Sequence, residues 1–183
     1  MRPITYTKYS SDELWSLCMS NDHKAFKILF DREFKHLLAF GLKVCPCQSD
    51  VKDAMQEIFT DLWVKRSTRK INHVKLYLLK SLKYRLIKSK PNGKVIDINS
   101  LAKGELSYTT EIISDIDSQS YQVKSILSQL PKQQQEILHL KYFQGLTNAQ
   151  IAEVLDINYQ SVSNRIHRIL NGFRKKIQNK ASI

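Results

Sequence analysis

Side chains able to read DNA bases gather near the C-terminus, in residues 159–170. Gln, Asn and Arg can each bond the edge of a base in the major groove through two atoms. Val162, Ile166 and Ile169 recur there at i, i+4 and i+7, which predicts a helix with one apolar face. The opposite face holds six candidate DNA contacts: Gln160, Ser161, Ser163, Asn164, Arg165 and Arg168.

A helix and a turn precede this segment and would hold it in place. Thr147 can cap the first helix by accepting a bond from a free backbone N–H, and it is also a candidate DNA contact. Asp156-Ile157-Asn158 interrupts the apolar periodicity, and Asp and Asn favour turns. Residues 146–170 therefore predict a helix-turn-helix of two short helices, the second of which contacts bases mainly through its N-terminal part. The alternative is an ordinary helical hairpin with a solvated polar face.

A basic stretch in the first half of the chain has the composition of a single-strand binding surface. Cations follow a phosphate backbone, and aromatic rings stack on unpaired bases. Five candidates lie in the loop 65–73, namely Arg66, Arg69, Lys70, Asn72 and His73. Five more lie on a helix predicted over 74–89, namely Lys75, Tyr77, Lys80, Lys83 and Tyr84. The alternative is a solvated basic surface whose tyrosines, Tyr77 above all, belong to the core.

The helix predicted over 49–65 carries an acidic row on its exposed side. The row consists of Asp53, Gln56, Glu57 and Asp61, of which the first three lie at i, i+3 and i+4. Taken alone, such a row is either a solvated face or a docking surface for a basic partner. No histidine, serine or cysteine stands at a spacing that would make these carboxylates catalytic, so we predict that the protein is not an enzyme.

The three cysteines indicate a reducing compartment, because an odd number argues against a disulfide framework. Cys45-Pro-Cys47 could form half of a metal site, yet no matching Cys/His pair has a suitable spacing. We therefore expect no metal and no cofactor, and interpret these cysteines as small hydrophobic residues near the end of a helix. No apolar run reaches the ~18 residues of a membrane span. The N-terminus also lacks the apolar core of a secretory signal, so we expect a cytoplasmic protein.

Composition and charge divide the chain into two modules. The 183 residues carry a net charge of +12 and few Gly or Pro, which favours an all-α fold and a polyanionic partner. Residues 1–88 have a net charge of +8, residues 89–120 of −2 and residues 121–183 of +6. Further helices are predicted over 11–19, 23–44 and 133–143. The expected organisation is a helical N-terminal domain over 1–89, a linker over 90–118 and a helix-turn-helix domain over 119–183.

The order of these elements resembles bacterial sigma factors of the extracytoplasmic-function (ECF) type, in the sigma-70 family. Residues 25–30, AFKILF, followed by Leu37-Leu38, look like the family's first long helix. Residues 53–63, DAMQEIFTDLW, are similar to its polymerase-docking motif D-x-x-Q-E-x-F-x-x-x-W. Residues 130–147, which begin LPKQQQEI and end YFQGLT, resemble the start of its C-terminal domain. The likeness covers residues 10–175, and the basic helix 75–90 further resembles members from Bacteroidetes-type bacteria.

The resemblance implies two small helical domains, a four-helix sigma-2-like domain and a sigma-4-like helix-turn-helix domain. The protein would bind core RNA polymerase and direct promoter-specific initiation of transcription. The acidic row would dock on the clamp helices of the largest subunit, and residues 130–143 would meet the flap. The loop 65–73 and the helix after it would recognise and melt the −10 element of promoter DNA, while the recognition helix would read the −35 element. An anti-sigma factor is a further partner usual for the family.

The chain departs from the family at four positions. The family often has a small residue at Gln160, a basic one at Ser163, a Gly at Asp156 and a tryptophan or similar aromatic at Tyr77. The −35 sequence therefore cannot be carried over from relatives.

Two other classes of protein compete with this interpretation. A helix-turn-helix regulator that binds duplex DNA without acting as a polymerase subunit leaves the acidic row and the loop 65–73 unexplained. An RNA-binding or adaptor protein that uses the basic blocks is the second alternative.

Overall fold

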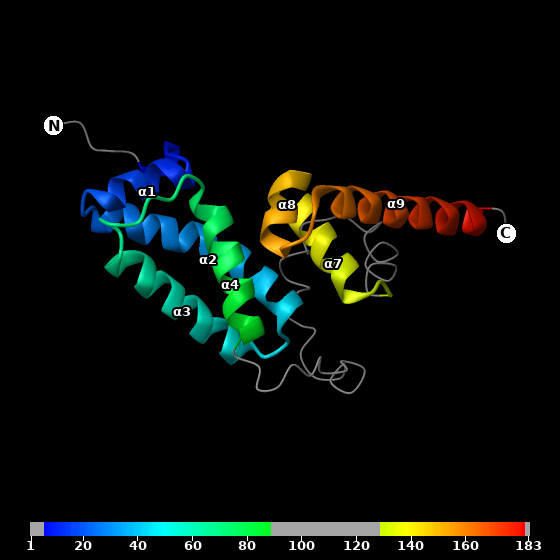
Figure 1. Cartoon of the computed structure of the whole chain (residues 1–183), viewed down its shortest axis with the longest axis horizontal. Coiled ribbons are helices and arrows are strands. Elements are labelled where there is room, and N and C mark those ends of the chain that lie inside the picture. The colour runs from blue at the N-terminus through cyan, green and yellow to red at the C-terminus, as the bar shows by residue number, and fades with distance from the viewer. Residues whose placement is uncertain (1–5, 89–128, 182–183) are drawn as a thin grey trace.

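The computed structural model describes residues 6–88 and 129–181, and every regular element within those two ranges is helical (Figure 1). The predicted all-α class is confirmed. The predicted linker, 90–118, and the first residues of the predicted second domain, 119–128, lie outside the described residues. Among the helices that are described, none is long and apolar enough to cross a membrane.

The N-terminal module contains a short 3-10 turn and four α-helices. They are η1 (Tyr6–Lys8), α1 (Ser11–Met19), α2 (His23–Val44), α3 (Gln48–Val64) and α4 (Val74–Lys88). Ser10 and Glu13 form a reciprocal capping box on α1, and Asp22 accepts from two backbone N–H groups at the start of α2. The bounds predicted for α1 and α2 are confirmed, and α3 begins and ends one residue earlier than predicted.

The apolar faces of these helices meet in a common core. Trp15, Phe40 and Leu82 are among its largest fully buried side chains, and each such side chain contributes about 1.5–3 kcal/mol by leaving water. A Cβ at Gly41 would collide with the side chain of Val51, so α2 and α3 pack too closely there for a larger residue. This packing fixes the outward faces of α3 and α4, which carry the candidate contacts.

The C-terminal module contains four helical segments. They are α7 (Lys132–Leu138), the π-helical turn η3 (His139–Phe143), α8 (Asn148–Leu155) and α9 (Tyr159–Ala181). The single helix predicted over 133–143 is thus α-helical only to Leu138, and the Gln144 N–H then donates to the His139 carbonyl at 3.0 Å. The expectation of a short second helix is wrong in length. Gly172 lies in open space without a positive φ, and the helix continues through it.

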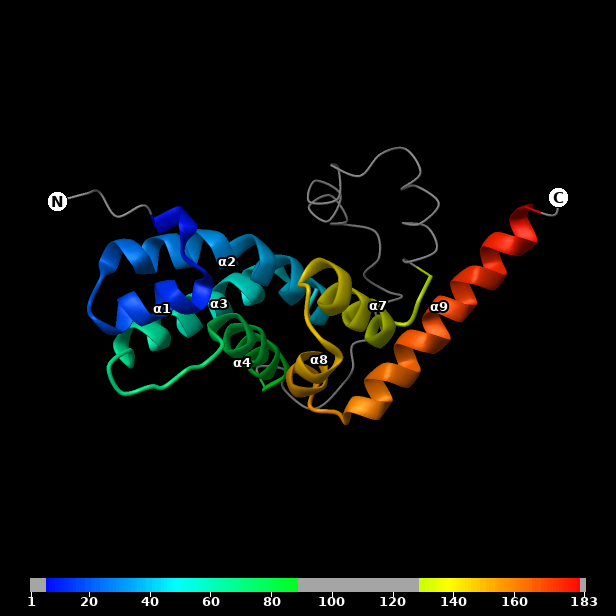
Figure 2. The same ribbon diagram turned by 90° about the horizontal axis from the view of Figure 1, so that it is seen from above.

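The two modules pack against each other. α4 contacts α8, and α7 contacts α2, while α9 extends away from the N-terminal module (Figures 1 and 2). Buried apolar side chains form one cluster that spans both modules. The contact between the modules could not be predicted from the sequence, and it determines which candidate residues are accessible.

Candidate protein-docking and nucleic-acid interfaces

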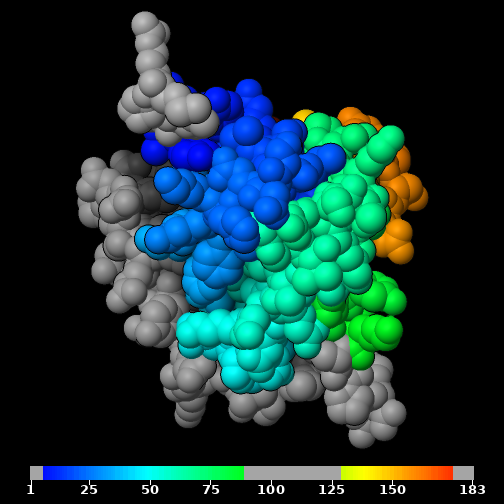
Figure 3. Space-filling model, turned by 90° about the vertical axis from the view of Figure 1, so that its left-hand side faces the viewer, coloured from blue at the N-terminus to red at the C-terminus, as the bar shows by residue number. Residues whose placement is uncertain are grey.

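The predicted acidic row runs along the outward side of α3. Asp53, Gln56 and Glu57 are exposed and Asp61 is half-buried. A shallow depression on this side is lined by Asp53, Gln56, Glu57, Thr60, Asp61 and Arg85. In the space-filling view of Figure 3, α3 (cyan to turquoise) lies on the near surface beside α1 and α2 (blue), and the C-terminal module (orange) shows at the right-hand edge. A partner could therefore reach the row while the two modules stay packed together.

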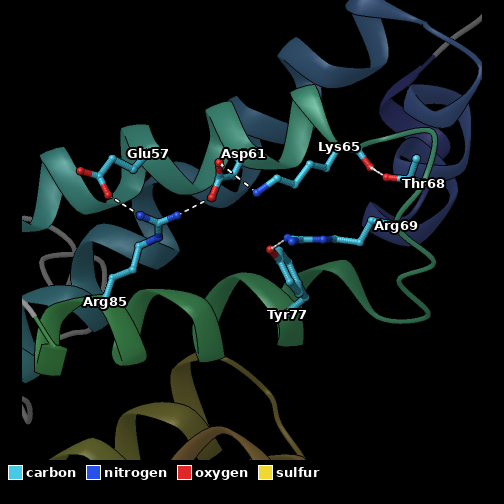
Figure 4. A network of polar contacts seen from close by, with 7 residues as sticks. All are labelled: Glu57, Asp61, Lys65, Thr68, Arg69, Tyr77 and Arg85. Atoms are coloured by element: carbon cyan, nitrogen blue, oxygen red, sulfur yellow. Dashed lines mark hydrogen bonds and ion pairs between the residues drawn. The ribbon is translucent and has the colours of Figure 1, made fainter.

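Arg85 of α4, which the sequence indicated only as one of the basic side chains of that helix, spans two carboxylates of this row. Its Nη1 donates to Glu57 and its Nη2 to Asp61 (Figure 4). Lys65 adds a second cation to Asp61, with Nζ 3.6 Å from Oδ1. Glu57 and Asp61 are neighbours one turn apart on α3, so one planar guanidinium can bridge them. No ion pair within the described part of the chain involves Asp53.

The loop 65–73 is held between α3 and α4 by its own polar groups. The Lys65 carbonyl accepts from the Thr68 hydroxyl at 3.2 Å and from the Arg69 N–H at 3.1 Å. The Arg69 guanidinium donates to the Tyr77 hydroxyl and lies 5.2 Å from the centre of its ring (Figure 4). Tyr77 is half-buried, so it contributes both to the core and to this basic loop.

Arg66 is anchored to the end of α3. Its guanidinium lies 4.0 Å from the centre of the Trp63 ring, an arrangement that favours a cation–π interaction. It also donates to the Trp63 carbonyl at 2.7 Å and to the Asn21 side chain. Lys70 and Asn72, further along the loop, are exposed. The loop thus presents the exposed side chains of Lys70 and Asn72, among others, beside an arginine whose position is fixed.

Asp12 of α1 positions the start of α4. One of its carboxylate oxygens accepts from the Val74 N–H at 2.7 Å, and the other lies 3.2 Å from His73 Nδ1. A carboxylate at a helix N-terminus stabilises the free N–H groups there. Asp12 lies 62 positions before Val74, so no local sequence signal pointed to this contact.

Two of the predicted cations on α4 form ion pairs with the C-terminal module. Lys83 Nζ lies 2.8 Å from Glu136 Oε1, and these two side chains are only 16% and 13% exposed. Lys80 Nζ lies 3.5 Å from Glu153 Oε1, where both side chains are 52% exposed. The predicted contact Tyr84 remains exposed on the same helix.

Gln144 joins the two modules at a third point. Its carbonyl accepts from Lys75 Nζ at 2.8 Å, and its side-chain amide donates to the His36 carbonyl of α2 at 2.9 Å. The same amide nitrogen lies 3.1 Å from Nε2 of His139, whose ring stacks 6.3 Å from Phe40. The carbonyl of His36 can only accept, so the amide nitrogen of Gln144 faces both groups as a donor. His139 Nε2 is therefore the unprotonated acceptor of a neutral ring.

The environment of His139 keeps its ring neutral. Burial above all, together with the charge interactions with Lys43, His36 and Lys75, lowers the pKa of His139 to about 4. This histidine is part of the contact between the modules and was not a candidate in the sequence.

Local chemistry builds the helix-turn-helix as predicted. Thr147 and Gln150 form a capping box on α8, with bonds of 3.3 and 2.9 Å. Gly145 precedes it at a φ of +69°, and Asp156 forms the turn at a φ of +54°. That value lies in the left-handed region, which glycine adopts most readily and Asp tolerates in turns. Asn158 caps α9 through its side-chain oxygen.

The predicted division of α9 into two faces is confirmed. Val162, Ile166 and Ile169 are buried. On the other side the exposed candidates are Gln160, Asn164 and Arg168, and the half-buried ones are Ser161, Ser163 and Arg165. The Gln160 amide donates to the Asn164 side chain at 3.1 Å, so these two polar groups lie side by side on the helix surface.

Two of the half-buried candidates also contact other helices. The Ser163 hydroxyl accepts from the Asn148 amide of α8 at 3.0 Å, which links the two helices of the motif. Arg165 donates to the Gln133 side chain of α7 at 3.2 Å. These bonds orient both side chains before any DNA is bound.

Within the described residues no group of three or more His, Cys, Asp or Glu side chains is placed to hold a metal ion. Cys18 and Cys45 are buried, and burial raises the pKa of the Cys18 thiol to about 12. Cys47 is exposed, so its interpretation as a small hydrophobic residue is wrong. Its sulfur lies 3.0 Å from the Ser49 hydroxyl at the start of α3.

Comparison with known proteins gives one family match and one match to the whole fold. Residues 120–171 match the family model described as Sigma-70, region 4. Among solved structures, the chain is similar to CnrH in complex with the cytosolic domain of CnrY, with a TM-score of 0.60 and 18% sequence identity. That similarity covers 93% of this chain and 99% of the other. No curated protein matches the chain.

The C-terminal module is therefore similar to region 4 of sigma-70 proteins. The expected resemblance to the sigma-70 family is confirmed over residues 120–171, and the similarity to CnrH, at 18% identity, extends to the fold. The assignment to the ECF type stays a prediction. The origin in a Bacteroidetes-type bacterium stays a prediction.

Proposed function

We propose that this protein is a sigma factor that binds core RNA polymerase and directs promoter-specific initiation of transcription. The observation that carries the proposal is the combination, in one fold, of an accessible acidic row on α3 with a helix-turn-helix that matches sigma-70 region 4. A regulator that only bound duplex DNA would use α9 but would have no use for the acidic row.

The acidic row is the proposed polymerase-docking surface. Asp53, Gln56, Glu57 and Asp61 offer carboxylate and amide acceptors on the outward side of one rigid helix. Such a surface suits the basic and amide side chains of a partner helix, because paired charges add specificity and speed to docking. The clamp helices of the polymerase are the expected partner, with the flap contacting residues 130–143.

Two surfaces are the proposed promoter contacts. The loop 65–73 and α4 would hold the −10 element through phosphate contacts and stacked bases. The N-terminal part of α9 would read the −35 element in the major groove, with Gln160, Ser161, Asn164 and Arg165 nearest the bases and Arg168 at a phosphate. The proposed domains are 1–89 for docking and −10 recognition, 90–118 as the linker, and 119–183 for −35 recognition.

The remaining roles follow from the same proposal. Polymerase performs the chemistry, so the chain itself is not proposed to be an enzyme, and its place of action is the cytoplasm. CnrH, which shares the fold, has been captured with the cytosolic domain of another protein. This supports the proposal that an anti-sigma partner binds the present chain.

Reconstitution with core polymerase tests the proposed function. We expect run-off transcription from a subset of promoters in a selected library, and none from core polymerase alone. The matched control is the variant Gln160→Ala with Arg165→Ala, which should still bind core polymerase but lose selection of the −35 element. Binding of the wild-type chain to duplex DNA, without any binding to core polymerase, would favour the simple regulator instead.

A further inference from the structure

Two cations of the chain itself, Arg85 and Lys65, already pair with carboxylates of the acidic row on α3, and Arg85 is the one that pairs with two of them. Arg85 occupies Glu57 and Asp61 at the C-terminal end of the row. Asp53 and Gln56, nearer the N-terminus of α3, are exposed, and no described side chain forms an ion pair with Asp53. The row is therefore divided into an open half and an occupied half.

We propose that Arg85 is an intramolecular competitor for the basic side chains of the docking partner. A partner would engage Asp53 and Gln56 first, and would reach Glu57 and Asp61 only by displacing Arg85. Arg85 would thus set both the strength and the order of docking. This inference rests on the proposed function of the row as the polymerase-docking surface.

The geometry favours competition over a purely structural role. Arg85 is 31% exposed, Asp61 is 38% exposed and Glu57 is 64% exposed, so water reaches all three groups. Exposed ion pairs contribute little to folding, and little free energy is needed to break them. A partner's cation can therefore replace Arg85 without disturbing the core beneath.

The position of Arg85 explains why one residue can block half of the row. It comes from α4, which packs against α3, and it reaches across to two carboxylates of the row (Figure 4). It is also one of the residues that line the depression. Its two nitrogens take one carboxylate each, an arrangement that a guanidinium can form and that the single ammonium of a lysine cannot reproduce in the same way. Lys65 approaches only Asp61, at 3.6 Å, so Glu57 depends on Arg85 alone among the described cations.

The test is a binding cycle with core polymerase, using the full-length chain. We expect Arg85→Gln to bind core polymerase roughly two- to fivefold more tightly than wild type, the range that an exposed ion pair permits. Lys88→Gln is the matched control, because it removes the same charge from the same helix one turn away, and it should leave the affinity unchanged. Arg85→Lys keeps the charge and should fall between wild type and Arg85→Gln.

The decisive measurement is the loss of affinity for core polymerase caused by Glu57→Gln, determined once in the wild-type protein and once in the Arg85→Gln variant. If Arg85 competes, this change should weaken core binding more in the Arg85→Gln background, where Glu57 is open, than in wild type. If Arg85 had only a structural role, Glu57→Gln would weaken core binding equally in the two proteins, and that result would overturn the inference. So would an Arg85→Gln protein that stays folded but binds as wild type or more weakly. Failure of the wild-type chain itself to bind core polymerase would instead reject the proposed function.

Discussion

The two proposed DNA-binding surfaces differ in what already occupies their polar groups. On α9, Gln160, Asn164 and Arg168 are exposed. On α4, Lys83 is paired with Glu136 at 2.8 Å and is largely buried. One ammonium cannot fully serve a carboxylate and a DNA phosphate at once. The α9 surface is therefore ready to bind in the packed arrangement of the modules, whereas full use of the α4 cations requires the modules to separate.

The contrast between the two surfaces depends on the contact between the modules, which contains His139. The largest expected effect is a loss of stability at low pH, when His139 takes up a proton. Its folded pKa of about 4 lies below the ordinary value of 6.5, so the unfolded chain binds the proton more readily. The stability that depends on the neutral ring is fully present above pH 6.5 and is lost as the pH falls toward 4, by at most about 3 kcal/mol. Denaturant unfolding between pH 7 and pH 4 measures this loss.

The matched control for the pH experiment is His139→Asn, which keeps a hydrogen-bond acceptor but has no group that titrates in this range. Its stability should fall less steeply than that of wild type over the same pH range. Equal slopes for the two proteins would mean that His139 does not govern the pH dependence, and that carboxylates elsewhere do.

The next effect is expected from Gln144→Ala. The change removes the donor that faces Nε2 of the buried His139, and a buried acceptor left unsatisfied costs about 1–3 kcal/mol. It should also free the α4 cations, so affinity for single-stranded −10 DNA should rise while duplex binding by α9 stays constant. Gln134→Ala, on the same segment, is the control. Unchanged stability would show that Gln144 does not hold the modules together.

A comparable effect on the other surface is expected from Arg165→Ala. If Arg165 reads a base, the change weakens binding to the preferred −35 duplex by about 1–3 kcal/mol and relaxes the preference at one position. Binding of single-stranded −10 DNA should not change. The measurement is a titration with a panel of duplexes at fixed salt, and an equal loss on every sequence would make Arg165 a phosphate contact.

The smallest expected effects on the unfolding free energy distinguish the two ion pairs that join the modules. Glu136→Gln should cost about 1–2 kcal/mol in unfolding free energy, because it leaves the largely buried Lys83 without its partner. Glu153→Gln removes an exposed pair with Lys80 and should cost less than about 0.5 kcal/mol. Equal costs for the two variants would contradict the difference in burial. The second variant thus serves as the control for the first.

Local signals in the sequence predicted the helices of both modules well. Caps at Ser10, Asp22 and Thr147 mark helix starts, and the apolar residues of α9 are buried as their spacing indicated. The errors are local in extent, but residue type does not account for them. The change to a π-turn after Leu138 and the continuation of α9 past Gly172 have no clear mark in residue type.

Contacts between distant residues were beyond the reach of periodicity and spacing. Arg85 lies 28 positions from Glu57, Lys83 lies 53 positions from Glu136, and Gln144 lies 108 positions from the carbonyl that it bonds. The sequence predicted which side chains could bind DNA or polymerase. It could not indicate which of those side chains the chain's own groups already occupy, because that depends on how the helices pack.

Binding of core RNA polymerase to the variant Gln56→Ala with Glu57→Ala tests the central claim most directly. Both residues are exposed on α3, so the fold should be unaffected, and Lys52→Ala on the same helix is the control. We predict that core binding weakens at least about tenfold, as expected when central residues of an interface are truncated, while duplex binding through α9 is unchanged. Core binding equal to that of the wild-type protein would contradict the assignment of the acidic row as the polymerase-docking surface.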